Sequence, residues 1–350
     1  MDTTMLTLPK MTRQKGIRKA LRHVALSSGT APETSNPTAR YSVVSLFAGC
    51  GGMDLGFRGG FNFLGHHYGR NAFEIVWANE INPDACATYR HNLGEHIVEG
   101  DINDVTDKMP SYADVIIGGF PCQDISINGK MLGIKGKRSS LYVAIVEAVR
   151  HLRPKVFVAE NVGGLLLKRN QFSRDKIMAD FKALNYDVTY KLYSASHYGV
   201  PQTRQRVFIV GTRKDQATFC PPTPTSLDKP VTAKEALEDL EDREQDKQFS
   251  HVWSMAKVSG EQGNRHLIAD RPGYTIRAEC HGNIQFHYSQ PRRISMREAA
   301  RIQSFPDNFL FLSGLRATER QIGNAVPPVL AWHIAKAVEE VLRKENCAKN

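Results

Sequence analysis

The chain has 350 residues, of which 41% are hydrophobic and 23% are charged, and its formal net charge is +10. A chain of this size can bury a full core, and its length favours two domains or one large domain with an insert. No apolar run reaches the roughly 18 residues that span a bilayer, and no signal peptide is recognisable, so we expect a cytoplasmic protein. The positive charge makes polyanions the first class of partner to consider, because basic surfaces attract phosphate groups.

The six cysteines are spread singly along the whole chain. They form no Cys-x-x-Cys pair and no Cys/His cluster with the spacing of zinc ligands. The pattern therefore predicts free thiols in a reducing cytoplasm, and no metal site.

Residues 1–40 are strongly basic, with seven lysines and arginines against two acidic residues. They end in a stretch rich in serine, threonine and proline, which is typical of a linker. We expect a flexible arm that is either solvated or in contact with a polyanion, and an organelle transit peptide is a weaker alternative.

From Tyr41 onward, short apolar runs alternate with helical stretches. The runs are YSVVSLFAG, FEIVWANE, ADVIIGGFPC, KVFVAEN and RVFIVGT. Short β-branched runs separated by helices predict an α/β fold, in which a mostly parallel sheet is covered by helices on both faces. Ligands of such sheets bind beyond the carboxyl ends of the strands.

A glycine-rich turn follows the first of these runs. Gly49, Gly51 and Gly52 stand between a predicted strand and a predicted helix, where glycine lets the backbone approach a ligand closely. The dinucleotide fingerprint would need glycine at Asp54, which argues against hydride transfer. Glu80 and Asp101 end two further candidate strands, and such acids can bind ribose hydroxyls or an adenine amino group. Together these residues predict a nucleoside-type cofactor without a required pyrophosphate.

The reacting residues are expected at the same edge of the sheet. Cys122 follows the run ADVIIGG, Glu160 and Asn161 end the run KVFVAEN, and Gln202, Arg204 and Arg206 are spaced by two. This spacing predicts that the last three side chains share one face of a strand. A thiol, an acid and two guanidinium groups suit a reaction in which a thiolate adds to an electron-poor ring, the acid handles a ring proton and the arginines hold an oxygen or a phosphate.

Residues 213–290 lack this regularity and are rich in Gly, His, Asn, Gln and aromatic residues, which is typical of an inserted, substrate-facing domain. A short helix capped by Thr232 with Glu235 is expected within it. A regular helix is expected to resume with a second capping box, Ser295 and Glu298. The sequence closes with a predicted amphipathic helix whose Ile334, Val338, Val341 and Leu342 share one face.

Six segments stand out along the chain, namely SLFAGCGGMDLGF, GGFPCQDIS, ENVGGLL, QTRQRVFIVG, PRRISMREAARIQSFPD and RQIGNAVPP. In this order they resemble the motifs of the DNA (cytosine-5) methyltransferases, and the resemblance extends from Tyr41 to the C-terminal helix. It implies a Rossmann-like S-adenosylmethionine-dependent methyltransferase fold. Residues 41–212 plus 291–345 would form the catalytic and cofactor-binding domain, against which the last helix packs, and 213–290 the target-recognition domain.

The resemblance also implies a mechanism. Cys122 would add to C6 of cytosine, so that C5 can attack the methyl group of S-adenosylmethionine. Glu160 would bond to N3 and the exocyclic amine, and Arg204 and Arg206 would hold O2 and a nearby phosphate. A base that the sequence does not identify would then remove the C5 proton.

For the cofactor, the resemblance implies contacts along the glycine loop, the second and third strands, and the methionine side. The residues implied are Phe47, Ala48, Gly49, Gly51, Glu80, Ile81, Asp101, Ile102, Pro121, Leu141 and Asn324. Two departures from the family pattern stand out. Ser45 occupies a position that is often aspartate, which weakens the hydrogen bonding expected there, and Ile81 replaces the usual aromatic residue.

A duplex buries C5 in its stack, so the target base must be extruded. The run from Gln123 to Arg138 suits a loop that closes over double-stranded DNA. Candidate DNA-binding residues are Gln123, Ser126, Asn128, Lys130, Gln202, Arg277, Asn283, Gln285 and His287. We expect a monomeric, nucleoid-associated modification enzyme of a restriction–modification system, with a cognate restriction endonuclease as its genetic partner.

Two alternatives stay open. The first is an enzyme of the same fold that methylates C5 of cytosine in transfer RNA, which PCQDIS and the insert at 213–290 disfavour. The second is a DNA-binding regulator without catalysis that uses the basic arm.

Overall fold

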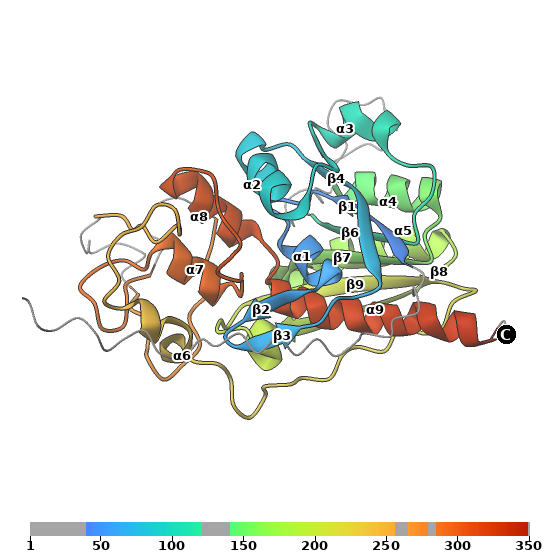
Figure 1. Ribbon diagram of the computed structural model, residues 1–350. Helices are drawn as coiled ribbons and strands as arrows, with labels where there is room; N and C mark the ends of the chain where they lie inside the picture. The colour runs from blue at the N-terminus through green and yellow to red at the C-terminus, as the bar shows by residue number, and fades with distance from the viewer. Residues whose placement is uncertain (1–39, 121–140, 256–264, 279–284, 349–350) are drawn as a thin grey trace, which may run out of the picture. The chain divides into compact units, whose positions relative to one another are not determined.

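The computed structural model describes residues 40–120, 141–255, 265–278 and 285–348, and the statements below refer to these residues. Its centre is a seven-stranded sheet with the order β5-β4-β1-β6-β7-β9-β8 (Figure 1). The strands are β1 (Tyr41–Leu46), β4 (Phe73–Glu80), β5 (Ile97–Glu99), β6 (Val115–Gly119), β7 (Val156–Val162), β8 (Tyr186–Ser194) and β9 (Gln205–Arg213). A separate hairpin pairs β2 (Phe61–Phe63) with β3 (His66–Tyr68).

Strands β5, β4, β1, β6 and β7 pair in parallel, whereas β9 is antiparallel to both β7 and β8. All five apolar runs form strands of this sheet, so the predicted α/β architecture with a mostly parallel sheet is confirmed. The run pattern did not predict β8 or the β2–β3 hairpin. Most side chains of β8 are exposed or half-buried, and such an edge strand lacks the continuous apolar run of a central one.

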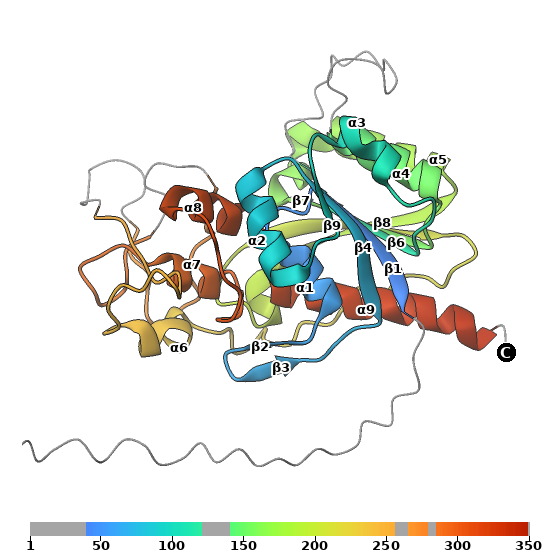
Figure 2. The same ribbon diagram turned by 45° about the horizontal axis from the view of Figure 1, so that its top comes forward.

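Helices cover both faces of the sheet (Figure 2). The α-helices of the described residues are α1 (Gly52–Arg58), α2 (Pro83–Leu93), α3 (Ile102–Val105), α4 (Leu141–Leu152), α5 (Gln171–Ala183), α6 (Ala233–Leu237), α7 (Met296–Ile302), α8 (Leu315–Asn324) and α9 (Pro328–Ala348), of which α6, α7 and α8 lie beside the sheet. Successive strand residues point to opposite faces, so Val43 joins the core under α1 and α9 while Val44 joins the core under α4 and α5. The sheet is therefore buried on both sides.

The C-terminal helix packs where the sequence predicted. Ile334, Val338, Val341 and Leu342 of α9 are all buried, and α9 lies against α1. The contact is close because Gly56 of α1 has no side chain. A Cβ added at Gly56 would lie 2.4 Å from the Ala331 Cβ and 2.5 Å from the Pro328 carbonyl oxygen.

The two predicted capping boxes are confirmed. The Thr232 hydroxyl accepts from the Glu235 amide at the start of α6, and the Ser295 hydroxyl accepts from the Glu298 amide at the start of α7. Between β9 and α7 the chain is largely irregular. Residues Ala39–Asn350 form one compact unit, and its division into a catalytic and a recognition domain stays a prediction.

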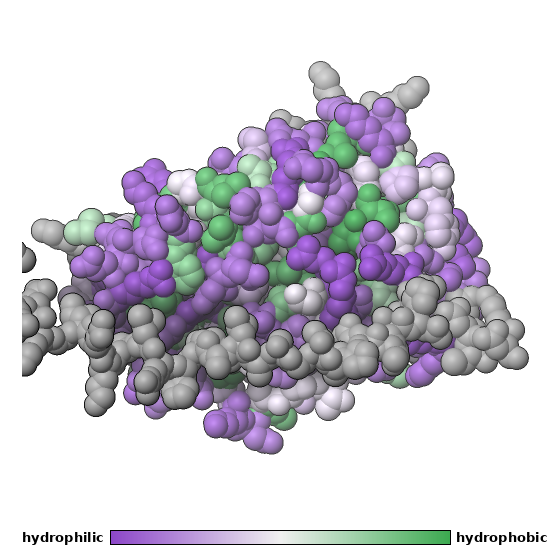
Figure 3. All heavy atoms as spheres, viewed as in Figure 1, coloured by the Kyte–Doolittle hydropathy of each residue, from purple (hydrophilic) through white to green (hydrophobic). Residues whose placement is uncertain are grey.

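Within the described ranges, no helix has both the length and the apolar character needed to cross a membrane. On the face that Figure 3 views, hydrophilic residues predominate and hydrophobic ones are interspersed among them.

In Gly56→Ala, overlap of the Cβ with backbone atoms of α9 should cost up to about 3 kcal/mol. Alanine gains about 1 kcal/mol over glycine inside a helix, so we expect the free energy of unfolding to fall by about 1–2 kcal/mol. Urea unfolding of the purified chain measures it. Gly69→Ala is the control, since its Cβ would meet no atom within 4 Å, and an equal loss in both variants would contradict the close α1–α9 contact.

Candidate active site

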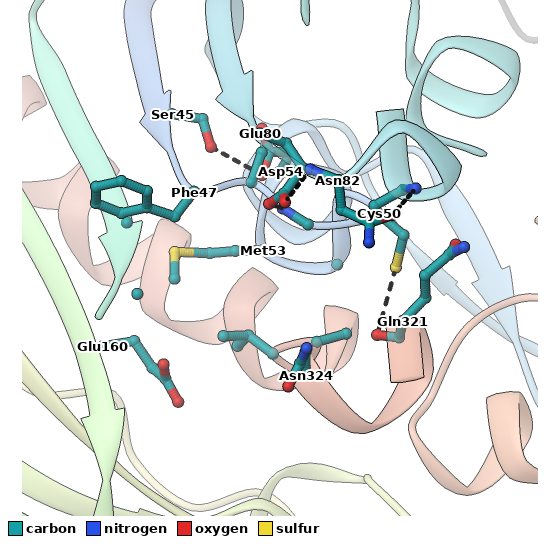
Figure 4. Close-up of a pocket in the computed structure, with 18 of the residues that line it drawn as sticks. Ser45, Phe47, Cys50, Met53, Asp54, Glu80, Asn82, Glu160, Gln321 and Asn324 are labelled. Atoms are coloured by element: carbon teal, nitrogen blue, oxygen red, sulfur yellow. Dashed lines mark hydrogen bonds between the residues drawn. The ribbon is translucent and has the colours of Figure 1, made fainter. Parts of the chain in front are cut away.

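A cavity of about 410 Å³ lies at the carboxyl edge of the sheet. The ends of β1, β4, β6 and β7 contribute its walls, together with the last turn of α8 and the chain that follows it. Figure 4 shows Glu80 and Asp54 on one side of this cavity, Glu160 and Asn324 on the opposite side, and Met53 between them. The cavity therefore joins two groups of polar residues that are far apart in the sequence.

The glycine loop after β1 has a backbone that few residues adopt. Gly49 and Gly51 have φ values of 57° and 92°, and Gly51 caps α1. Phe47 also has a positive φ, 56°, which is strained for a residue with a side chain. The loop packs closely on the end of the chain, since a Cβ at Gly52 would lie 2.4 Å from the Val326 carbonyl oxygen. This contact brings the residues after α8 to the cavity.

Glu80, the last residue of β4, fastens the glycine loop to the sheet. Its Oε2 accepts from the Gly49 amide at 2.9 Å, and its Oε1 accepts from the Asn82 amide at 2.8 Å. A carboxylate oxygen has two lone pairs, so each oxygen retains one for a donor in the cavity. Glu80 is thus held in place and can still bind hydroxyl groups.

A buried carboxylate that we did not predict as a site residue lies beneath the loop. Asp54 accepts from the Ser45 hydroxyl at 3.0 Å and from the Tyr89 hydroxyl at 2.8 Å. Burial raises the pKa of Asp54 to about 6, although both hydrogen bonds oppose the shift. We had expected Ser45 to weaken the hydrogen bonding at this position. That expectation is wrong, because the Ser45 hydroxyl donates to Asp54. An acid amid the apolar residues of GGMDLGF was the signal that could have revealed this pair.

Glu160 of β7 and Arg206 of β9 form an ion pair across the sheet. The Arg206 Nε lies 2.8 Å from the Glu160 Oε1, and each side chain is 12% exposed. Burial raises the pKa of Glu160, while the charges of Arg206 and Arg204 oppose the shift. The other oxygen, Oε2, lies against Gly119 at the end of β6, where an added Cβ would be 2.8 Å away. The ion pair thus fixes one oxygen and leaves the other beside the strand that precedes Cys122.

The prediction that Gln202, Arg204 and Arg206 share one face of a strand is wrong. Strand β9 begins at Gln205, so only Arg206 belongs to it. Gln202 is fully buried, and its side chain bonds to the Ile302 carbonyl and the Ile276 amide. Arg204 is also buried and bonds to two carbonyls, of Ile276 and Gly323. Hydrogen bonds to distant parts of the chain override the alternation that spacing alone implies.

Six of the residues predicted to bind the cofactor line the cavity. They are Phe47, Ala48, Gly49, Glu80, Leu141 and Asn324. Gly51, Ile81, Asp101 and Ile102 are not among the lining residues. Asp101 caps α3, Ile102 is buried in the core and Ile81 is exposed at the end of β4. The loop and the second strand thus meet at the cavity, whereas the third-strand residues lie outside its lining.

The cavity also includes polar residues that we did not predict, namely Asn82, Asp84, Arg320 and Gln321. Asn82 caps α2 by accepting from the Ala85 amide, and Pro83 follows it. An asparagine followed by proline at the start of a helix is a recognisable cap, so this position could have been read from the sequence. Arg320 and Gln321 come from α8, whose approach to the loop no local pattern indicates.

Several predicted residues lie outside the described part of the chain. They are Pro121, Cys122, Gln123, Ser126, Asn128, Lys130 and Asn283. Arg277 is described and exposed. Gln285 and His287, in contrast, are 4% and 1% exposed. Because burial removes them from solvent, we do not retain these two, or the buried Gln202, in a DNA-binding surface.

The sequence profile of the C-5 cytosine-specific DNA methylases matches residues 41–267 and 244–340, which together span most of the chain. The chain belongs to this family. It is 37% identical to the Type II methyltransferase M.NgoFVII of Neisseria gonorrhoeae, over 85% of this chain and 86% of that protein. It is 33% identical to M.NgoPII of the same organism, over 90% and 99%. The predicted enzyme class, a DNA (cytosine-5) methyltransferase, is thereby confirmed.

Solved structures agree with this assignment. A candidate DNA modification methyltransferase encoded within an E. coli prophage is 26% identical with a TM-score of 0.64, over 87% of this chain and 99% of that one. The Dnmt2 methyltransferase of S. pombe is 17% identical with a TM-score of 0.65, over 88% and 100%, and this likeness concerns the fold alone. The predicted Rossmann-like S-adenosylmethionine-dependent methyltransferase fold is confirmed.

The stability contributed by Asp54 should depend on pH. Its pKa is raised from 3.8 to about 6 in the folded chain, so protonation favours folding, and the stabilisation is lost as the pH rises through 6. We expect the free energy of unfolding of the wild type, relative to Asp54→Asn, to be about 2 kcal/mol higher at pH 4.5 than at pH 8. Urea unfolding at both pH values measures this difference. A difference that is the same at both pH values would show that Asp54 is not buried as an acid.

Proposed function

We propose that this chain transfers a methyl group from S-adenosylmethionine to C5 of a cytosine extruded from duplex DNA, as the modification enzyme of a restriction–modification system. One observation carries the proposal beyond family membership. The glycine loop held by Glu80 and the Glu160–Arg206 ion pair line the same cavity. A methyl donor and an acceptor base can therefore meet at one edge of the sheet.

The side of the cavity near the glycine loop fits S-adenosylmethionine. Its acidic side chains are Asp54, Glu80 and Asp84, and carboxylates suit hydroxyl groups and positive charge better than phosphate. Glu80 would hold the ribose hydroxyls, Phe47 and Leu141 would contact apolar parts, and Asn324 would bond to the methionine portion. When bound, the sulfonium supplies an electrophilic methyl group. The residues of this chain then need to activate only the acceptor.

Glu160 and Arg206 suit the acceptor cytosine. A carboxyl group whose pKa is raised by burial can share a proton with N3 of the ring and accept from the exocyclic amine. Arg206 keeps the carboxyl group in one orientation, and we propose that it donates to the cytosine O2. Hydrogen bonds at both positions would draw electrons from the ring and make C6 more electrophilic.

Cys122 is the proposed nucleophile. It follows the last residue of β6, Gly119, by three positions in the sequence, and we propose that it acts at the carboxyl edge of the sheet. Its thiolate forms a bond to C6 as N3 takes up a proton that the Glu160 carboxyl group can supply, and C5 then uses the resulting electron pair to bond to the methyl carbon. The bond from that carbon to sulfur breaks, and S-adenosylhomocysteine leaves. A base removes the C5 proton, the C5–C6 double bond re-forms as the thiolate leaves C6, and N3 returns its proton to Glu160. The cysteine is regenerated, and each turnover transfers one methyl group.

Duplex DNA is the proposed substrate because the chain is basic and its relatives M.NgoFVII and M.NgoPII are Type II methyltransferases. Among the residues that the structure describes, we propose Arg277 as a DNA contact, because it is exposed and basic. Gln123, Ser126, Asn128, Lys130 and Asn283 are retained from the sequence. We further propose a monomer that acts in the cytoplasm on nucleoid DNA, with a cognate endonuclease as its genetic partner.

Methyl transfer from labelled S-adenosylmethionine tests the proposal. We expect label in duplex DNA and none in transfer RNA, and Cys122→Ser should reduce the initial rate at least about 1000-fold, because a hydroxyl is a far weaker nucleophile than a thiolate. Cys220→Ser is the matched control, since Cys220 is an exposed thiol away from the cavity. Label in transfer RNA alone would support the RNA alternative, and full activity of Cys122→Ser would refute the covalent mechanism.

The role of Glu80 can be tested by cofactor binding. Glu80→Gln should raise the Kd for S-adenosylmethionine about 10-fold or more, because a neutral amide oxygen cannot accept from the loop and the ribose as a carboxylate does. Calorimetric titration of the purified chain measures the Kd. Glu74→Gln, an exposed position on the same strand, should leave it unchanged. Equal Kd values for Glu80→Gln and the wild type would exclude Glu80 from the cofactor site.

A further inference from the structure

Three parts of the chain meet at the buried guanidinium group of Arg204. Its Nη1 donates to the Ile276 carbonyl at 2.8 Å and its Nη2 to the Gly323 carbonyl at 2.9 Å. Arg204 precedes β9, Ile276 belongs to the predicted recognition region and Gly323 to the last turn of α8. Both Arg204 and Gly323 line the cavity. One side chain thus bridges the predicted recognition region and a wall of the cavity.

The partners of Arg204 are unusual for a buried cation. Its side chain is 1% exposed, and a guanidinium group without water normally pairs with a carboxylate. Within the described ranges, no carboxylate lies at ion-pair distance from Arg204, and the nearby Glu160 pairs with Arg206. Burial accordingly lowers the pKa of Arg204 well below its ordinary value. Removing the Arg204 side chain would leave the buried carbonyls of Ile276 and Gly323 without this donor. Its two hydrogen bonds therefore hold these two segments together.

The backbone beside Arg204 continues this junction. Residues 273–276, named here the recognition anchor, run alongside residues 201–204. The Gly273 amide donates to the Pro201 carbonyl at 2.9 Å, and the Thr203 amide donates to the Gly273 carbonyl at 2.8 Å. The Ile276 amide donates to the Gln202 side chain at 3.0 Å. The recognition anchor is therefore hydrogen-bonded at both of its ends to residues 201–204.

Helix α8 closes the junction from the other side. A Cβ added at Gly323 would lie 2.4 Å from the Arg277 carbonyl carbon and 2.5 Å from the Ala278 amide nitrogen. These atoms belong to the residues that directly follow the recognition anchor. Arg277, which is exposed, is thus held by its backbone next to a residue that lines the cavity. A shift of the anchor would move both the exposed arginine and the cavity wall.

We infer that Arg204, which the resemblance implied as a contact of the cytosine O2 or a phosphate, is instead a positioning residue for target selection, because both of its terminal nitrogens donate to backbone carbonyls. It locks the recognition anchor and α8 to the rim of the cavity, so that the exposed Arg277 is held in a fixed register with the extruded cytosine. This inference rests on the proposed function. Discrimination between sequences depends on differences in transition-state binding, and a small misalignment of the reacting groups can reduce a rate about 100-fold. The rate of methyl transfer to the preferred sequence depends most on the fixed register. Loss of the register should therefore lower kcat/KM more for that sequence than for a mismatched one.

The test compares kcat/KM for the preferred duplex, identified by bisulfite sequencing of methylated DNA, with kcat/KM for duplexes that carry one mismatched base pair in that sequence. Arg204→Met should lower kcat/KM for the preferred duplex about 100-fold and lower the discrimination ratio about 10-fold. The Kd for S-adenosylmethionine should stay within about 2-fold, because Glu80 does not take part in the junction. Arg204→Lys should recover part of the ratio, since an ammonium group can still donate to one carbonyl.

Gly323→Ala disturbs the same junction without altering Arg204 and should also lower the discrimination ratio. If Arg204→Met no longer binds S-adenosylmethionine, the discrimination ratio of Gly323→Ala decides between the outcomes. Arg213→Met is the matched control, because Arg213 ends the same strand β9 and also donates to a backbone carbonyl, that of Arg153. Its discrimination ratio should equal that of the wild type.

Two results would overturn the inference alone. The first is an equal loss of kcat/KM on preferred and mismatched duplexes for Arg204→Met and Gly323→Ala, which would make Arg204 a direct substrate contact or a purely structural residue. The second is an unchanged ratio in both variants. A wild-type chain that methylates no duplex would instead overturn the proposed function, and this inference with it.

Discussion

The buried ion pair between Glu160 and Arg206 is the interaction on which the proposed chemistry depends. Burial of a carboxylate without a partner is costly, and Arg206 reduces that cost without abolishing the upward shift of the Glu160 pKa. The pair exists because β9 runs antiparallel to β7, with Arg206 opposite Val162 and Phe208 opposite Glu160. The antiparallel strand β9 thus places Arg206 beside Glu160, which stands near the end of the parallel strand β7.

The same edge of the sheet explains how the two proposed binding functions, for the methyl donor and for the acceptor base, can share one cavity. Parallel strands end together, so β1 and β4 bring the glycine loop and Glu80 beside the acid of β7. Helix α8 contributes the remaining wall through the close contact of Gly52 with the chain after it. Beneath the loop, Asp54 joins α1 to β1 through Ser45 and to α2 through Tyr89. The loop conformation is therefore supported by the sheet and by both neighbouring helices.

Features that depend on residues close together in the sequence could be predicted. The central strands, the glycine loop, the acid at the end of β4 and both capping boxes follow from local patterns, and the structure contains them. Pairings between distant segments were not predictable. The spacing of Gln202 and Arg204 is that of a strand, but their bonds to Ile276 determine their burial. Likewise, His287 and Gln285 looked like DNA contacts because their side chains are polar, and only the fold places them inside.

The fate of the hydrogen on C5 tests the central claim most directly. Duplex DNA with tritium at C5 of cytosine can be incubated with the chain and unlabelled S-adenosylmethionine, and the release of tritium to water compared with the number of methyl groups transferred. The proposed mechanism predicts equal amounts, because the C5 proton must leave before the cysteine can. Methyl transfer without tritium release would mean that another atom of the base accepts the methyl group, and would contradict the proposed mechanism.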